Sequence, residues 1–268
     1  MNVRIKFAKY GTMKFISHLD VMRYFQKAAR RAELPVLYSE GFHPHQIMSF
    51  ASPLGVGQTS EAEYFDLALK EVLSPAEICR RLNETMAEGM QILDAAILPE
   101  PKPQTKQETA MALVAASSYL ILRKDGYEEE VPAELLRQEF VKFLSQKEIL
   151  TIKQSKKTES TINLAQFIFD FSADATPTPY SGEYENGLAF YILVSAGSVN
   201  NIHPETVMRA FYQYLSREYS PYAYQLHRLE TYADLSLKKV SQAEIAERAA
   251  AGTMPKRRLV PLMDYYNV

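Results

Sequence analysis

Three of the chain's five histidines lie within 50 residues of one another near the N-terminus. His18, His43 and His45 all fall in the segment Phe15–Tyr64. Imidazole is the side chain best suited to proton transfer near neutral pH. His18 follows Ser17 at the expected start of a helix, where the helix dipole favours the neutral form that a general base needs. His18, with His43 as its assistant, is therefore the candidate for catalysis, and a structural histidine that bonds the neighbouring loop is the alternative.

The loop at residues 40–46 carries two of these histidines around a proline, His43-Pro44-His45. Side chains at i and i+2 of an extended loop point to opposite sides, which does not suit joint metal binding, and Glu40 is the one carboxylate nearby. We therefore expect no metal. Gly41 and Pro44 of this loop fix a backbone path that can offer N–H groups to an anion. The predicted RNA or anion contacts of this loop are Ser39, Gly41, His43 and Pro44.

A second candidate site is a run of basic residues on the helix that follows Ser17. Arg23, Lys27, Arg30 and Arg31 share one helical face by their spacing, and Lys14 precedes the helix. Residues 1–50 hold eight basic and three acidic residues, a net charge of +5, whereas residues 61–100 hold nine acidic and three basic residues, a net charge of −6. Lys14 and the four basic residues of the helix are predicted to contact RNA phosphates, and a solvated helix face without a ligand is the alternative.

Motifs of the common enzyme classes are missing from the sequence. No P-loop, dinucleotide-binding, GxSxG or HExxH pattern occurs, and Gly55-Val56-Gly57 is typical of a hairpin turn. The single cysteine, Cys79, excludes an internal disulfide and a CxxxCxxC iron–sulfur site within this chain. No cofactor is expected. The N-terminus lacks the apolar core of a signal peptide, no apolar run is long enough to cross a bilayer, and we expect a cytoplasmic protein.

The hydrophobic pattern predicts an α+β fold of two tandem ferredoxin-like (β-α-β-β-α-β) units. In the first unit, strands are expected at residues 3–7, 36–39, 47–51, 65–69 and 90–98. Its helices are expected to run from Ser17 to about Ala32, with Leu19, Met22, Phe25, Ala29 and Ala32 as the apolar stripe, and from Ser74-Pro75 to Gly89. The open sheet face would show Arg4, Lys6 and Tyr64, too few aromatic residues for an RNA-recognition motif.

The second half repeats this architecture with different lengths. Strands are expected at residues 110–123, 148–154, 164–171, 188–196 and 226–232, and helices at 132–145 and 204–217. The predicted organisation is an N-terminal unit at 1–99, a Pro-rich linker over 99–108, a C-terminal unit at 108–232 and a helical and basic tail at 233–268. Such a tail is either disordered or docks on a surface.

The segment FISHLDVMRYFQKAARRAELPVLYSEGFHPHQIMSFASPLGVGQTSEAEYFD resembles the signature of the radical-SAM-linked protein family. That family is a bacterial domain of unknown function, found alone or fused to a radical SAM protein with a cobalamin-binding region. Its members usually carry Asn at the position of His43 and Lys near Gln46. The resemblance implies a radical SAM enzyme as a partner in trans. A weaker resemblance, in architecture only, is to RNA-processing proteins built from tandem ferredoxin-like units.

Three functions follow as hypotheses. The leading one is a non-catalytic accessory protein that binds RNA, or presents a substrate, for a separate radical SAM enzyme. The second is a metal-independent endoribonuclease that uses His18, with His43, to activate a 2′-hydroxyl. The third is a protein-interaction module without nucleic acid, which would dock a partner through the acidic 61–100 region or the tail.

Overall fold

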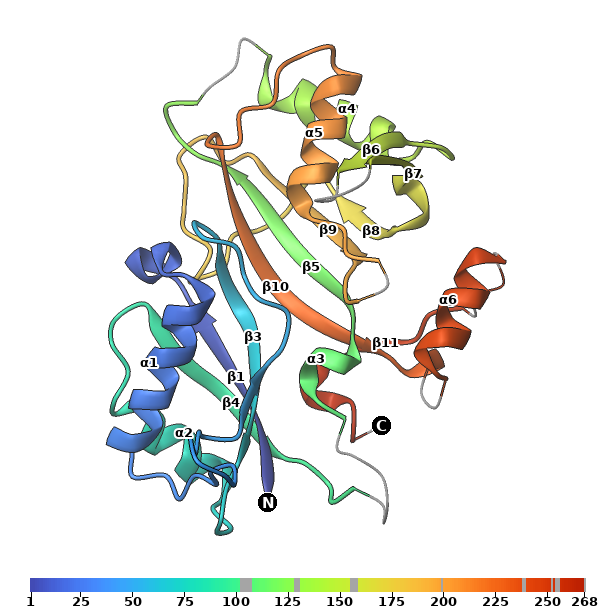
Figure 1. The fold of residues 1–268 in the computed structure, drawn as a ribbon. Helices are drawn as coiled ribbons and strands as arrows, with labels where there is room; N and C mark the ends of the chain where they lie inside the picture. The colour runs from blue at the N-terminus through green and yellow to red at the C-terminus, as the bar shows by residue number, and fades with distance from the viewer. Residues whose placement is uncertain are drawn as a thin grey trace.

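The computed structural model describes residues 1–101, 108–127, 131–154, 159–198, 200–237, 240–251, 253 and 256–267. Most of the predicted linker over 99–108 lies outside these ranges. The fold is mixed α+β with one large, mostly antiparallel sheet (Figure 1). This confirms the α+β class, whereas the finer assignment to two tandem ferredoxin-like units stays a prediction.

The sheet of nine described strands has the central order β4-β1-β3-β10-β5-β9-β8. β2 pairs with β3 beside this path, and β11 pairs with β10. The strands in chain order are β1 (Asn2–Lys9), β2 (Met48–Phe50), β3 (Thr59–Ala68), β4 (Met90–Ile97), β5 (Val114–Arg123), β8 (Ile168–Ser172), β9 (Ala189–Ser195), β10 (Tyr224–Asp234) and β11 (Leu259–Pro261). A separate hairpin pairs β6 (Leu150–Gln154) with β7 (Glu159–Asn163).

Helices cover the two halves of the sheet separately. In the first half α1 (His18–Arg31) and α2 (Pro75–Asn83) lie beside β1 and β4, and in the second half α4 (Ala133–Leu144) and α5 (Pro204–Tyr214) lie beside β5 and β9 (Figure 1). The short helix α3 (Ala110–Leu113) lies near the C-terminus, and α6 (Gln242–Ala250) projects from the sheet (Figure 1). A 3₁₀ turn, η1 (Gly11–Phe15), joins β1 to α1.

Alternate residues of β1 build the first core. Val3, Ile5 and Phe7 are buried on one face and pack with Phe25 of α1 and Phe65 of β3. The Phe7 and Phe25 rings lie 4.5 Å apart, centroid to centroid, and Phe25 lies 4.8 Å from Phe65. Aromatic contacts of this kind add to the free energy that apolar burial supplies. The second half has its own core, centred on Phe140, Phe190 and Phe211.

The two halves join where β10 runs parallel to the start of β3. His227 lies opposite Thr59 and Arg228 opposite Ser60 at this junction, which we call the seam. β3 therefore begins at Thr59, six residues before the predicted start. The six extra residues pair with β1 and, at their beginning, with β10.

The other face of the first half is covered, which corrects the prediction of an open surface there. Arg4 is fully buried and Tyr64 is almost fully buried, under a segment that includes Leu262 and Tyr265. The Arg4 guanidinium donates to both carboxylate oxygens of Asp66, at 2.9 and 3.2 Å, and to the carbonyl of Leu262 at 3.0 Å. The C-terminal segment is thus docked on the chain itself.

Of the predicted apolar stripe of α1, Phe25, Ala29 and Ala32 are buried and Met22 is half-buried, whereas the prediction for Leu19 is wrong. Leu19 is 62% exposed, whereas Val21 and Ala28 are buried beside Phe25 and Ala29. Similarly, Leu164 begins a 3₁₀ turn rather than a strand, and β8 starts at Ile168.

Candidate functional site: a basic helix and the hollow at its N-terminal end

Helix α1 begins at the residue that the capping pattern predicts. The Ser17 hydroxyl accepts a hydrogen bond from the backbone N–H of Asp20 at 3.3 Å and donates to the Asp20 carboxylate at 2.6 Å. This cap satisfies one of the unpaired N–H groups of the first turn. It fixes His18 as the first helical residue, at the end of α1 nearest to η1.

The basic face of α1 is open to solvent. Arg23, Lys27, Arg30 and Arg31 are all exposed. The Arg23 side chain, 71% exposed, has one nearby acid, Asp20, at 3.7 Å. Arg31 donates to the carbonyl of Thr85 at 2.9 Å, which holds one guanidinium nitrogen toward α2. Exposed pairs of this kind contribute little to stability, so the cations can bind other anions at small cost.

Lys14 is placed apart from this face. Its ammonium donates to the side-chain oxygen of Gln225, on β10, at 3.0 Å, and lies 5.3 Å from the ring centroid of Phe15. Lys14 is therefore a contact between the two halves. Phe15 itself is 64% exposed and was not predicted as a site residue.

The loop between Tyr38 and Gln46 is closed at its base and open at its tip. The hydroxyl of Ser39 lies 2.8 Å from Nδ1 of His45 and accepts the His45 N–H at 3.1 Å. Gly41 has φ +112°, which only glycine adopts without strain. The tip is formed by exposed residues: Gly41, Phe42, His43 and Pro44. Phe42 is completely exposed and is the residue here most suited to stack on a base.

His18 lines a hollow at the N-terminal end of α1. The hollow is narrow: its empty volume of about 320 Å³ includes open solvent, and the space that its walls enclose is about that of one water molecule. Most of its lining comes from the segment Phe15–Tyr64 that the sequence singles out. The lining residues are Phe7, Lys9, His18, Val21, Phe50, Ala51, Ser52, Pro53, Leu54, Glu63 and Tyr64. The His18 ring packs edge-on against Phe50 with centroids 5.7 Å apart.

Three charged side chains lie beside this hollow. Lys9 continues the inward line of Phe7 on β1, and Glu63 is the cross-strand partner of Phe7 on β3. Arg228 reaches in from β10 and donates to the Glu63 carboxylate at 2.8 Å and to the carbonyl of Ser52 at 2.9 Å. Arg228 also donates to the Tyr119 hydroxyl at 3.2 Å. The second half of the chain thereby supplies one charge beside a hollow whose lining belongs to the first half.

Burial lowers the pKa of the Lys9 ammonium, Glu63 opposes this effect, and the charge of Arg228 adds to it. Because the pKa of Lys9 is lower in the folded protein than in the unfolded chain, the unfolded chain holds the proton to a higher pH. The free energy of unfolding therefore rises with pH between the folded pKa and the unfolded pKa of 10.5. Replacing Lys9 by methionine should remove this cost of folding. Lys9→Met is expected to raise the free energy of unfolding at pH 7 by about 1–2 kcal/mol.

Urea unfolding of wild type and Lys9→Met at pH 7 and pH 10 measures this effect. The gap between the two proteins should shrink as the pH rises, because wild-type Lys9 loses its proton in that range. Subtracting the variant also removes the contribution of every other group that titrates there. A gap that is equal at both pH values would contradict the assignment.

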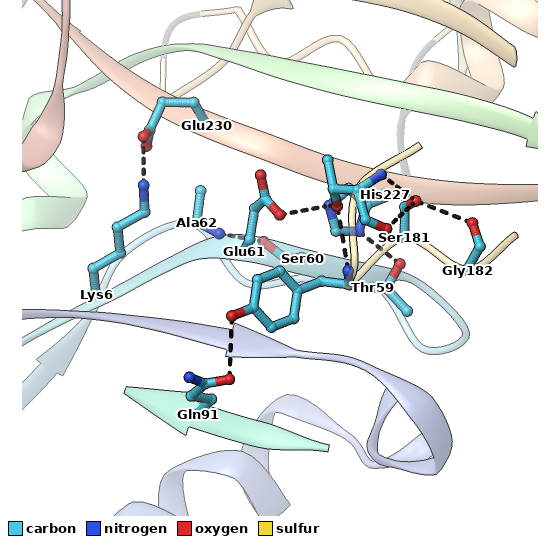
Figure 2. A network of polar contacts seen from close by, with 12 residues as sticks. Lys6, Thr59, Ser60, Glu61, Ala62, Gln91, Ser181, Gly182, His227 and Glu230 are labelled. Carbon is cyan, nitrogen blue, oxygen red and sulfur yellow. Dashed lines mark hydrogen bonds and ion pairs between the residues drawn. The ribbon is translucent and has the colours of Figure 1, made fainter. Parts of the chain in front are cut away.

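A second polar cluster lies at the seam, with the buried side chains of His227 and Thr59 at its centre (Figure 2). Nδ1 of the buried His227 lies 2.9 Å from the Thr59 hydroxyl, and its Nε2 lies 3.7 Å from the Glu61 carboxylate. Burial raises the pKa of Glu61, but its contacts with His227 and Thr178 outweigh burial and lower it. A hydroxyl, an imidazole and a carboxylate could form a nucleophilic triad. Because His227 and Thr59 are both buried, the cluster is better suited to joining the halves.

His18 and His43 occupy different surroundings. His18 is half-buried in the hollow, whereas His43 is exposed at the loop tip. Within the described ranges, no group of three or more His, Cys, Asp or Glu residues is arranged to hold a metal ion. In the same ranges no helix is both long and apolar enough to cross a membrane.

Sequence reasoning missed Lys9, Glu63 and Arg228, for two different reasons. The sequence pattern could have indicated Lys9, because it continues the alternation of Val3, Ile5 and Phe7. That alternation places a charged side chain on the buried face of the strand. Glu63 and Arg228 gave none, because they are 165 positions apart and only the seam brings them together.

A model of the family described as an uncharacterized protein conserved in bacteria (DUF2344) matches residues 2–204. The chain belongs to this family. The matched range contains α1, the loop and all residues that line the hollow, while Arg228 lies beyond it. No curated protein matches the chain.

Among solved structures, 29 chains match this one. One belongs to the crystal structure of a Cbf5-Nop10-Gar1 complex, with 12% identity, a TM-score of 0.40, and coverage of 97% of this chain and 60% of that one. Another is an unknown protein from Galdieria sulphuraria, with 12% identity, a TM-score of 0.22, and coverage of 85% and 96%. The chain thus spans 60% of the length of the first, and neither similarity supports an argument about function.

Proposed function

We propose that this protein is a non-catalytic accessory protein that binds RNA for a separate radical SAM enzyme. The observation that carries the RNA part is the open basic face of α1, where Arg23, Lys27 and Arg30 point to solvent. Three exposed cations along one helix can contact several phosphates of a nucleic-acid strand at once. The exposed Phe42 and Phe15 supply stacking groups near the basic residues in sequence.

The radical SAM part rests on the resemblance of the Phe15–Asp66 segment to the radical-SAM-linked family. A single cysteine leaves this chain without the three ligands that such a cluster requires, so that chemistry would belong to the partner. Membership of an uncharacterized bacterial family is compatible with this role. The cytoplasm, where both RNA and such enzymes occur, is the proposed compartment.

The fold part of the proposal is a tandem of ferredoxin-like units at residues 1–99 and 108–232, followed by the tail. Its support is the strand order, β4-β1-β3-β2 in the first half and β10-β5-β9-β8 in the second. In both halves the first and third strands are central and two helices follow the first and third strands, as in a β-α-β-β-α-β unit. The hairpin β6-β7 is then an insertion between α4 and β8.

Fluorescence anisotropy with labelled tRNA and ribosomal RNA fragments over a salt series tests the RNA proposal. The triple variant Arg23→Glu/Lys27→Glu/Arg30→Glu should bind about 10- to 100-fold more weakly, and the slope of log affinity against log salt should fall by about 2. Both changes follow from the loss of three phosphate contacts.

The matched control changes the same amount of charge on the second half. Lys142, Lys147 and Arg217 are exposed there, and reversing them to Glu alters the net charge equally. If this control weakens RNA binding as much as the α1 variant does, the affinity depends on the net charge of the protein and α1 is not the binding site. Gel analysis of the same RNA after incubation, with wild type and His18→Ala, decides the ribonuclease alternative.

A further inference from the structure

The loop between Tyr38 and Gln46 is attached to the middle of α1. The Gln46 side chain is 7% exposed, and its amide nitrogen donates to the carbonyl of Gln26, in α1, at 3.1 Å and to the Tyr38 hydroxyl at 3.2 Å. Gln46 also pairs with Tyr38 in an isolated antiparallel bridge. Arg23 and Arg30 lie three residues before and four residues after Gln26, so they share its side of the helix. The base of the loop therefore lies next to these two exposed cations.

The tip of this loop carries a phenyl ring that lies in solvent. Phe42 is completely exposed. It lies four positions before Gln46, so the two Cα atoms are at most about 14 Å apart. Below the tip, the Ser39 N–H donates to the carbonyl of His45 at 2.8 Å, and the His45 N–H donates to the Ser39 hydroxyl at 3.1 Å. A hydrogen-bonded loop thus holds the ring in water beside the basic side of α1.

An exposed aromatic ring beside phosphate-binding cations suits RNA whose bases are unpaired. In a duplex each base is covered by its neighbours in the stack, whereas an unpaired base can stack on an aromatic side chain. A duplex also has the higher charge density, so the cations of α1 alone would favour a duplex. A preference for a single strand would consequently come from the ring and not from charge.

We propose that the RNA segment bound by this protein is single-stranded, with one unpaired base stacked on Phe42 and the neighbouring phosphates on Arg23 and Arg30. This inference rests on the proposed function, because it assumes that α1 binds RNA, and it adds which form of RNA the surface selects. The segment can be a free end, an internal loop or a bulge of a larger RNA.

Fluorescence anisotropy with a labelled RNA of about 15 nucleotides, alone and annealed to its complement, tests the preference. Wild type should bind the single strand about tenfold more tightly than the duplex. Phe42→Ala should weaken binding of the single strand about tenfold and leave binding of the duplex unchanged. Because Phe42 is completely exposed, its truncation should not affect folding.

The matched control truncates an exposed aromatic residue of the second half. Tyr214 lies on α5, is 43% exposed and donates to the Glu139 carboxylate of α4 at 3.0 Å. Tyr214→Ala should bind both RNAs as wild type does. If it weakens binding of the single strand as much as Phe42→Ala does, the loop is not the stacking site and the proposal is overturned.

A tryptophan at the loop tip measures the contact directly. The sequence contains no tryptophan, so Phe42→Trp gives the protein a single indole, and Tyr214→Trp places one on α5 as the control. The emission of Phe42→Trp should be quenched by the single strand, because a stacked base lies against the indole, and much less by the duplex. The emission of Tyr214→Trp should change with neither RNA.

The outcomes separate this inference from the proposed function. If wild type binds the single strand and the duplex equally well, or if Phe42→Ala binds the single strand like wild type, the stacking proposal is overturned while RNA binding remains. If wild type binds neither RNA, the proposed function fails and this inference fails with it. Emission of Phe42→Trp that shifts to the blue with vesicles of phosphatidylglycerol and phosphatidylcholine, but does not respond to RNA, would make the loop a membrane contact and would also overturn the proposal.

Discussion

Replacing Arg228 by alanine is expected to lower the free energy of unfolding by about 3–5 kcal/mol. Arg228 is buried and serves Glu63, the carbonyl of Ser52 and the hydroxyl of Tyr119. Its removal leaves the Glu63 carboxylate buried without its cation and frees the Ser52 carbonyl, and an uncompensated buried charge is among the most destabilising changes known. Urea unfolding followed by circular dichroism measures the loss.

A second substitution separates the charge effect from the loss of packing. Arg228→Met keeps most of the volume of the side chain, and Glu63→Gln removes the orphaned charge. The double variant Arg228→Met/Glu63→Gln should recover more than half of the stability that Arg228→Ala loses, because both buried charges are then absent. A double variant as unstable as Arg228→Ala would show that the ion pair is not the cause.

Local patterns predicted the regular elements well. The hydroxyls of Ser17 and Ser74 cap α1 and α2 as the sequence indicates, with the N–H groups of Asp20 and Glu77 as donors. Both signals act within one helical turn, and their geometry is therefore contained in the spacing of a few residues. The same applies to the alternation that predicts β1.

Contacts between distant segments could not be predicted in this way. The parallel pairing of Thr59 with His227 and the covering of Arg4 by Leu262 join positions 168 and 258 apart in sequence. The alternation of apolar and polar residues within a strand does not specify which distant segment the strand pairs with. The candidate site was consequently half predicted: the exposed basic face followed from helix periodicity, whereas the hollow depends on the seam.

Replacing Leu262 by alanine is expected to lower the free energy of unfolding by about 2–5 kcal/mol. Leu262 is fully buried in a small cluster with Tyr64 and Tyr265, and its carbonyl accepts from the Arg4 guanidinium. The truncated side chain would leave a cavity over the face of β1 and β3 that carries Arg4. Val72→Ala is the control, since Val72 is 78% exposed and should change stability by less than about 0.5 kcal/mol.

This prediction also tests the hypothesis that residues 233–268 bind a partner protein. Removing residues 233–268 altogether would not test it, because β10 extends to Asp234 and β11 (Leu259–Pro261) pairs with it. Such a truncation would damage the sheet whatever the tail binds. If the C-terminal segment were held ready for a partner, Leu262→Ala would leave unfolding unchanged and would weaken complex formation alone. A loss of several kcal/mol in the isolated protein instead makes this segment part of the fold and leaves the acidic 61–100 region as the surface for a protein partner.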